Sequence, residues 1–139
     1  MHHTKQNWAV VIPARYESSR FPGKPLADIC GMTLIERVWR QCVQAVEEGL
    51  VYVATDDERI SNHVKSFGGK VIITSKDCLT GTDRVYEAAK KLGLNNVINV
   101  QGDEPLINPS DISLFINKML EEPTKIFNGM TEIFAENEF

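Results

Sequence analysis

Short, continuous apolar runs alternate along this chain with stretches whose apolar residues recur every three or four positions. The run Trp8–Ile12 is apolar throughout, which is typical of a strand buried on both faces. Residues from Leu34 to Val46 instead repeat apolar side chains at helical spacing. The same two patterns then alternate along the rest of the sequence. Further strands are predicted at Leu50–Ala54, Val71–Thr74, Val97–Val100 and Gly129–Ala135, and further helices around Ile60–Phe67, Val85–Leu92 and Pro109–Leu120.

The ends of the helices carry recognisable signals. Thr33 and Glu36 have the spacing of a capping box, Gly49 is placed to stop the first helix, and Pro109 suits a first helical turn. Alternation of buried strands with helices predicts an α/β fold with a parallel sheet and helices on both faces. The 139 residues suffice for one domain, residues 1–139, but not for two. In such sheets, ligands bind beyond the carboxyl ends of the strands.

Charge and cysteine content exclude several classes of function. With 15 Lys+Arg against 19 Asp+Glu, the net charge is −4, which argues against a general nucleic-acid binder. No apolar run approaches the roughly 18 residues of a membrane span, and the first residues contain no apolar signal core. The three cysteines show no CxxC spacing, which argues against a zinc site or a disulfide framework. We therefore expect a cytoplasmic protein without membrane or nucleic-acid partners.

The loop after the first predicted strand, Pro13–Pro25, is basic. Its charged side chains sum to 3 − 1 = +2 within the acidic chain: Arg15, Arg20 and Lys24 against Glu17. Prolines restrict its backbone, and arginine and lysine are the usual ligands of phosphate oxygens. No GxxxxGK[ST] or GxGxxG motif is present. The loop therefore indicates either a polyphosphate site of another kind or a solvated basic loop.

An acidic turn, Val100–Pro105, follows the predicted strand Val97–Val100. A carboxylate at a strand's carboxyl end can hold a divalent cation that bridges nucleotide phosphates, and Asp103 is the candidate ligand. An ordinary turn that ends the strand is the alternative. Together with a cationic loop at the same edge of the sheet, the turn favours a metal–nucleotide site.

Two helix starts have both a functional and a structural interpretation. At Thr80–Arg84, free backbone N–H groups and two hydroxyls can bind a sugar, base or phosphate, or Thr80 or Thr82 can simply cap the helix. The acidic segment Thr55–Glu58 could bind a metal, but acids in a first helical turn are favoured by the helix dipole. We interpret that second segment as structural.

Five segments resemble the 3-deoxy-manno-octulosonate cytidylyltransferases, also called CMP-Kdo synthetases, and they occur in that family's order and spacing. They span positions 11 to 105. The segments are Val11-Ile12-Pro13-Ala14-Arg15-Tyr16, Arg20-Phe21-Pro22-Gly23-Lys24-Pro25-Leu26, Val53-Ala54-Thr55-Asp56-Asp57, Gly81-Thr82-Asp83-Arg84 and Asn99-Val100-Gln101-Gly102-Asp103-Glu104-Pro105.

The resemblance implies a GT-A/Rossmann-like nucleotidyltransferase that uses CTP and Mg²⁺. Such enzymes transfer a cytidylyl group to an eight-carbon acidic sugar for lipopolysaccharide biosynthesis and release pyrophosphate. The catalytic residues implied are Arg15, Lys24 and Asp103, with Asp103 as the Mg²⁺ ligand. The sugar-binding residues implied are Gln101 and Arg84. The nucleotide-binding residues implied are Pro13, Ala14, Arg15, Arg20, Lys24, Gly81 and Thr82.

Two features depart from the family pattern. Many members carry His-Gln before the glycine that Gly81 matches, whereas this chain has Cys78-Leu79-Thr80, so the sugar is either Kdo or its 8-amino relative. Members also run to roughly 250 residues, so the chain corresponds to the N-terminal, nucleotide-binding half of the cytidylyltransferase domain. The other half would supply a second carboxylate, most of the sugar pocket and the homodimer contacts, and we expect little turnover without it. A neuraminate-type cytidylyltransferase and a non-catalytic nucleotide-binding fragment are the alternatives.

Overall fold

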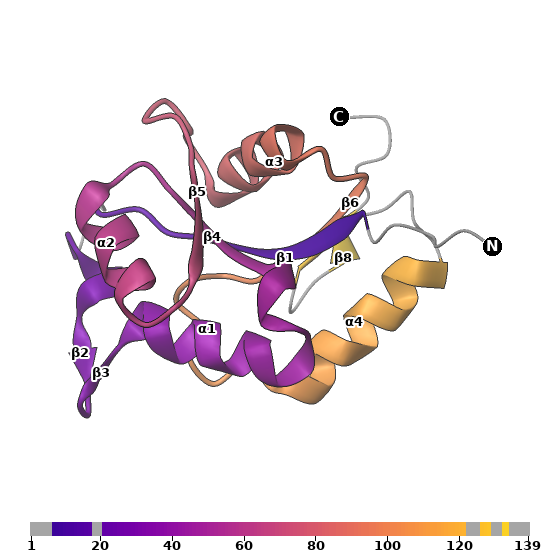
Figure 1. Ribbon diagram of the computed structural model, residues 1–139, viewed down its shortest axis with the longest axis horizontal. Coiled ribbons are helices and arrows are strands. Elements are labelled where there is room, and N and C mark those ends of the chain that lie inside the picture. The colour runs from indigo at the N-terminus through magenta and orange to yellow at the C-terminus, as the bar shows by residue number, and fades with distance from the viewer. Residues whose placement is uncertain (1–6, 18–20, 122–125, 129–131, 134–139) are drawn as a thin grey trace.

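The computed structural model describes residues 7–17, 21–121, 126–128 and 132–133. Its centre is a six-stranded sheet ordered β5-β4-β1-β6-β7-β8, in which only the β7–β8 pairing is antiparallel (Figure 1). A separate hairpin pairs β2 with β3. The strands are β1 (Trp8–Pro13), β2 (Asp28–Ile29), β3 (Met32–Thr33), β4 (Val51–Thr55), β5 (Lys70–Ile73), β6 (Asn96–Asn99), β7 (Ile126–Asn128) and β8 (Glu132–Ile133), and the α-helices are α1 (Leu34–Ala45), α2 (Glu58–Ser66), α3 (Gly81–Leu92) and α4 (Pro109–Glu121).

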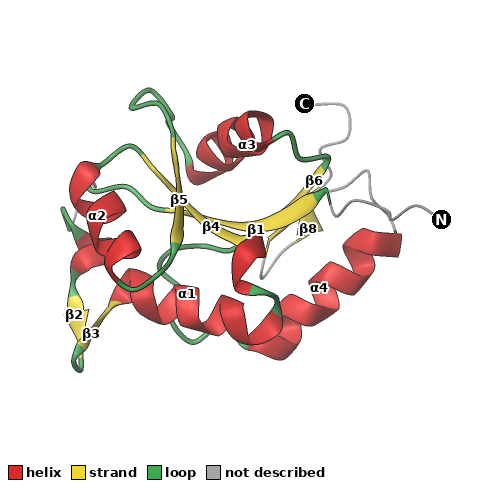
Figure 2. Ribbon diagram, viewed as in Figure 1, coloured by secondary structure: helices red, strands yellow, loops and turns green. Residues whose placement is uncertain are grey.

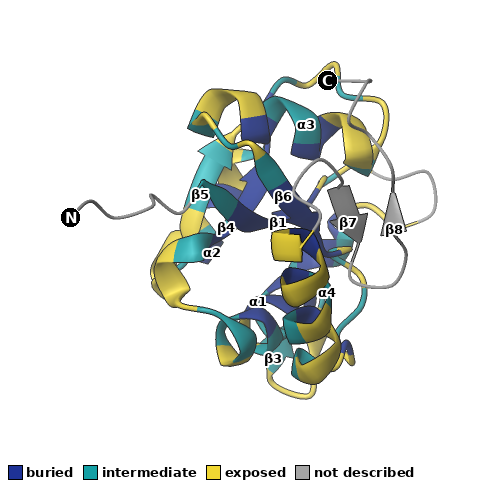
Figure 3. Ribbon diagram, turned by 90° about the vertical axis from the view of Figure 1, so that its right-hand side faces the viewer, coloured by how far each residue is buried: buried dark blue, intermediate teal, exposed yellow. Residues whose placement is uncertain are grey.

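Helices cover both faces of the sheet, with α3 on one face and α1, α2 and α4 on the other (Figure 2). Side chains alternate between two apolar clusters along β1: Val10 and Ile12 pack with the three-helix layer, and Val11 packs beneath α3. The central strands and the inner faces of the helices are therefore buried, as Figure 3 shows for β1, β4 and β6. The predicted α/β fold with a parallel sheet is confirmed.

Some predicted boundaries are wrong in detail. Helix α1 ends at Ala45, because Val46 adopts an extended conformation (φ −142°, ψ 167°), and Gly49 lies in a separate short 3₁₀ helix. Thr33 does cap α1, accepting a hydrogen bond from the Glu36 N–H at 3.3 Å. The Glu36 carboxylate instead pairs with Arg40, an ion pair of 2.6 Å one helical turn along. Among the described contacts, therefore, only the Thr33 half of the predicted capping box is present.

Two further differences concern strands. The hairpin β2–β3 was not predicted, since each of its strands has only two residues and gives no measurable periodicity. Its turn holds Cys30 and Gly31 at φ values of 53° and 92°. The strand predicted at Gly129–Ala135 overlaps β8, while β7 lies just before it; residues 129–131 and 134–135 of that prediction lie outside the described residues.

The order of strands creates one switch point. From β1 the chain moves outward through β4 to β5, then returns to place β6 on the opposite side of β1. The loops that follow β1 and β6 therefore diverge at their carboxyl ends, where open α/β sheets form a ligand crevice. The basic loop Pro13–Pro25 and the acidic turn Val100–Pro105 are these two loops.

Candidate nucleotide-binding site

A cavity of about 230 Å³ opens at the switch point between β1 and β6. Its walls come from the end of β1, the basic loop, the first residues of α1 and α3, and the acidic turn after β6. Residues far apart in the sequence thus share one small space. Seven of the predicted site residues line it, namely Pro13, Ala14, Arg15, Lys24, Gly81, Gln101 and Asp103.

The floor of the cavity depends on Gly102. A Cβ atom placed on Gly102 would lie 2.7 Å from the backbone oxygen of Pro13, closer than real side chains come. Val100, two residues earlier, donates its N–H to the Val11 carbonyl at 3.1 Å, which extends the β1–β6 pairing. The absence of a side chain at Gly102 therefore lets the acidic turn cross directly over the end of β1.

Lys24 and Asp103 face each other across the cavity. Gly23, in the left-handed region at φ 74°, turns the basic loop into a short 3₁₀ helix that begins at Lys24. The Lys24 ammonium lies 3.6 Å from a carboxylate oxygen of Asp103. Both side chains remain about half exposed, at 44% and 54%. The sequence predicted both residues but not their pairing.

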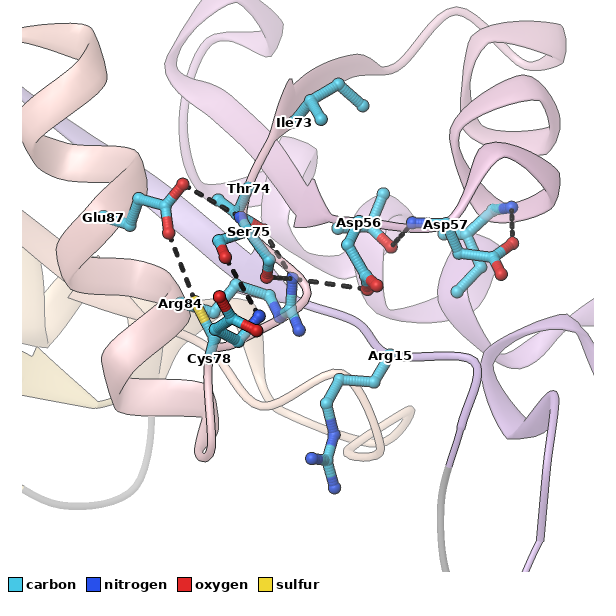
Figure 4. Close-up of polar contacts among 12 residues, drawn as sticks. Arg15, Asp56, Asp57, Ile73, Thr74, Ser75, Cys78, Arg84 and Glu87 are labelled. Atoms are coloured by element: carbon cyan, nitrogen blue, oxygen red, sulfur yellow. Dashed lines mark hydrogen bonds and ion pairs between the residues drawn. The ribbon is translucent and has the colours of Figure 1, made fainter.

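Arg15 lines the cavity shortly after the end of β1. Its side chain is exposed, and its guanidinium donates to the backbone oxygen of Leu79 at 3.5 Å, in the turn that leads into α3. Figure 4 shows the side chain extending away from the strand ends where Asp56 and Thr74 lie. Arg15 thus joins the basic loop to the start of α3. Arg20 lies outside the described residues.

The start of α3 is closed by a capping box. The Thr80 hydroxyl accepts from the Asp83 N–H at 3.0 Å, and the Asp83 carboxylate accepts from the Thr80 N–H at 3.2 Å. A Cβ on Gly81 would lie 3.3 Å from Pro13 Cγ, so the helix N-terminus approaches the cavity closely. That terminus carries positive dipole charge and favours anions. Thr82, by contrast, is exposed and does not line the cavity.

Arg84 is buried and does not line the cavity. It is 1% exposed, and its guanidinium donates to the Thr74 hydroxyl and to the Ser75 carbonyl and lies 3.4 Å from the Asp56 carboxylate (Figure 4). These partners follow β4 and β5, so Arg84 ties the first turn of α3 to two strand ends. Its predicted contact with a sugar stays a prediction.

The structural interpretation of Thr55–Glu58 agrees with the geometry. The Asp57 carboxylate caps α2 by accepting from the Arg59 and Ile60 N–H groups at 2.8 and 3.2 Å. Hydrogen bonding to the Arg59 side chain is the main reason that the pKa of Asp57 lies below its usual value. The role of Asp56 as the partner of Arg84 was missed, because nothing local in the sequence marks a contact between two separate loops.

A magnesium site needs carboxylates or other oxygen ligands from the protein. Among the described residues, no three His, Cys, Asp or Glu side chains come together as a ready-made metal site. Mg²⁺ nonetheless binds nucleotides through one or two carboxylates, with phosphates and waters as its other ligands. The half-exposed carboxylate of Asp103 beside the cavity fits that requirement.

Binding of anionic ligands at the switch point of a parallel sheet is characteristic of the nucleotide-binding α/β proteins, and this chain has their fold. The profile of the family described as cytidylyltransferase matches residues 9–139. The chain therefore belongs to the cytidylyltransferase family. Within residues 7–17 and 21–121 and the two short strands beyond, no helix is long and apolar enough to cross a bilayer.

Individual relatives agree with this family. The chain is 53% identical over 120 residues to the 8-amino-3,8-dideoxy-manno-octulosonate cytidylyltransferase of Shewanella sp. (strain W3-18-1), covering 84% of the chain and 49% of the relative. It is 48% identical over 130 residues to the 3-deoxy-manno-octulosonate cytidylyltransferase of Bacteroides thetaiotaomicron, covering 92% and 51%. The chain thus spans about half the length of the relatives it matches.

Solved structures show the same fold. A structure of CMP:2-keto-3-deoxy-manno-octonic acid synthetase complexed with CTP superposes with a TM-score of 0.77 at 47% identity, over 84% of this chain and 48% of that one. A cytidylyltransferase from Leptospira borgpetersenii superposes with a TM-score of 0.71 at 24% identity, over 85% and 50%. The predicted fold class and family are therefore confirmed.

Proposed function

We propose that this chain binds CTP at the switch-point cavity and contributes the nucleotide half of a cytidylyltransferase acting on Kdo or 8-amino-Kdo. The products would be a CMP-sugar, for lipopolysaccharide biosynthesis, and pyrophosphate. The observation that carries the proposal is the cavity itself, which brings the basic loop, the start of α3 and the acidic turn together. A CTP complex of a 47% identical protein supports the choice of nucleotide.

The lining residues divide naturally by charge. Arg15 and Lys24 would bind the triphosphate, aided by the helix N-terminus at Gly81 and, by family resemblance, by Arg20. Asp103 would hold Mg²⁺, which supplies neutralisation of phosphate charge when bound. Pro13 and Ala14, which line the cavity, would lie beside the nucleotide, and Gln101 would contact the sugar.

The reaction needs little from the protein beyond position and charge. The anomeric hydroxyl of the sugar attacks the α-phosphorus of CTP, forming the new P–O bond as the bond to pyrophosphate breaks. The proton of the hydroxyl passes to solvent water. Such transfers are accelerated mainly by alignment and by cations that neutralise the departing oxygens. Arg15 and Lys24, which both line the cavity, would hold the β- and γ-phosphates during departure.

The proposal also concerns which sugar accepts the cytidylyl group. Relatives named for Kdo and for 8-amino-Kdo match this chain at similar identity, 48% and 53%. The segment Cys78-Leu79-Thr80 stands where many family members carry His-Gln, so both Kdo and 8-amino-Kdo are proposed as the sugar. The proposed reaction also uses CTP and therefore belongs in the cytoplasm. A full-length assembly would be a homodimer, as the resemblance implies.

Calorimetry with CTP and Mg²⁺, followed by a coupled pyrophosphate-release assay, tests the proposal. Kdo, 8-amino-Kdo and neuraminate are compared side by side, with a full-length relative as the positive control. We expect the chain to bind CTP but to turn over far more slowly than the relative, because it spans about half the relatives' length. Preference for neuraminate would overturn the assigned sugar, and no binding of CTP would overturn the nucleotide site.

A further inference from the structure

Tyr16 is held between a cation and a glycine in the basic loop. The Arg59 guanidinium carbon lies 3.3 Å from the centroid of the Tyr16 ring. On the glycine side, a Cβ at Gly23 would lie 2.9 Å from the ring carbon Cε2, so no larger residue fits there without displacement. The Gly23 N–H also donates to the Tyr16 carbonyl at 2.6 Å, which closes the loop between the two residues.

Arg59 is itself fixed by helix α2. Its Nε and Nη2 atoms contact the two oxygens of Asp57 at 3.2 and 2.7 Å, a two-pronged ion pair. Asp57 is the N-cap of α2, and its carboxylate accepts backbone N–H bonds from that helix. A bidentate arginine–carboxylate pair restrains the direction of the guanidinium more than a single contact does. The position of Arg59 above the ring is therefore set by the start of α2.

Lys24 directly follows Gly23. Gly23, at φ 74°, directs the chain into the 3₁₀ helix that begins at Lys24, and the Lys24 ammonium lies 3.6 Å from Asp103. A displacement of the Tyr16 ring would free Gly23 and, with it, the backbone of Lys24. The contact of Arg59 with Tyr16 is thus linked to the cavity through Gly23 and Lys24, which are adjacent in the chain.

We infer that Asp57, Arg59, Tyr16 and Gly23 form a clamp that positions Lys24 for the phosphates of the bound nucleotide. The inference rests on the proposed function, since it concerns the same cavity. Arg59 and Tyr16 are positioning residues, because neither lines the cavity. Their effect on a ligand must therefore pass through Lys24 and depend on the phosphates.

Substitution of Arg59 tests the clamp. Arg59→Ala should weaken binding of CTP by about two- to fivefold, the strength of an exposed cation–π contact, and leave binding of cytidine unchanged. Arg40→Ala is the matched control: it removes another exposed arginine that pairs with a carboxylate and lies near an aromatic ring, but on α1. It should change neither affinity. Equal weakening of CTP and cytidine by Arg59→Ala would overturn the inference.

A double-mutant cycle separates positioning from independent binding. If Arg59 acts through Lys24, Arg59→Ala should have little further effect on CTP binding in a Lys24→Ala background. Additive losses would mean that Arg59 interacts with the nucleotide separately, and the clamp would be overturned.

Hydrogen exchange of the Gly23 and Lys24 amides provides a readout that needs no ligand. These amides should exchange about two- to fivefold faster in Arg59→Ala, while the amides of α1 should not change. Unaltered exchange would overturn the clamp even where CTP binds normally. Faster exchange with no CTP binding by the unaltered chain would leave the clamp standing and overturn the proposed function instead.

Discussion

The Lys24 ammonium and the Asp103 carboxylate lie 3.6 Å apart in the lining of the switch-point cavity, although they belong to loops that follow different strands. Both groups are about half exposed, so their mutual attraction is weak and easily exchanged for other partners. A nucleotide would separate them, since phosphates attract Lys24 and Mg²⁺ attracts Asp103. The proposed ligand must therefore offer an anionic group to Lys24 and a cation to Asp103.

Loss of the Lys24 cation should weaken the binding of ligands that carry phosphates and no others. Lys24→Ala is expected to weaken CTP by about tenfold, as removal of a charged hydrogen-bond donor does, and to leave cytidine binding unchanged. Calorimetry with both ligands measures the difference. Equal losses for CTP and cytidine would show that Lys24 supports the fold of the cavity instead of the phosphates.

The Asp103 carboxylate should make nucleotide binding depend on the metal. In Asp103→Asn, removal of Mg²⁺ by a chelator should change CTP affinity much less than in the unaltered chain. Without Mg²⁺ the variant should bind CTP at least as well, because one negative charge near the phosphates is gone. Titrations with and without chelator measure both effects. An unchanged response to Mg²⁺ would contradict the assignment.

Addition of a methyl group at Gly102 should distort the floor of the cavity. Gly102→Ala forces a carbon toward the Pro13 oxygen, 2.7 Å away, and should lower the free energy of unfolding by about 1–3 kcal/mol. Gly49→Ala is the matched control, because a Cβ there meets nothing within 4 Å. Urea unfolding of both variants measures the difference, and equal stabilities would contradict the close approach.

Loss of Arg84 should lower the stability of the fold. Arg84→Met leaves Asp56 without its cation and is expected to cost about 3 kcal/mol of unfolding free energy, as breaking a buried pair does. The exposed control Arg40→Met should cost less than about 1 kcal/mol. Urea denaturation compares them. A normally stable Arg84→Lys variant that loses sugar binding in calorimetry would instead support the sugar contact implied by family resemblance.

Acid should remove the contribution of the Asp57–Arg59 pair to the stability of the folded chain. Hydrogen bonding from Arg59 lowers the pKa of Asp57 in the folded chain, so the folded state favours the ionised carboxylate. The stabilisation is then complete above the unfolded pKa of about 3.9 and is lost as the pH falls through the lower folded value. Asp57→Asn keeps a capping oxygen but no charge. Melting temperatures of both proteins should converge in acid; a gap independent of pH would contradict the pair.

The types of element could be read from local patterns. The helical spacing of Leu34, Val38 and Cys42 and the unbroken apolar run of Trp8–Ile12 depend only on neighbours a few positions away. The same holds for the basic loop and the acidic turn, which were recognised by composition and by their place after predicted strands. The hairpin β2–β3 was not predicted, since two-residue strands carry no period.

What the sequence by itself determined was therefore the succession of strands and helices and the residues suited to bind a nucleotide. The tertiary structure decided which of them meet: Lys24 with Asp103, Arg84 with Asp56, and Arg59 with Tyr16. Periodicity and charge are local properties of the chain. Contacts between distant residues instead depend on the order of strands in the sheet, which placed β6 beside β1 and brought the two loops together.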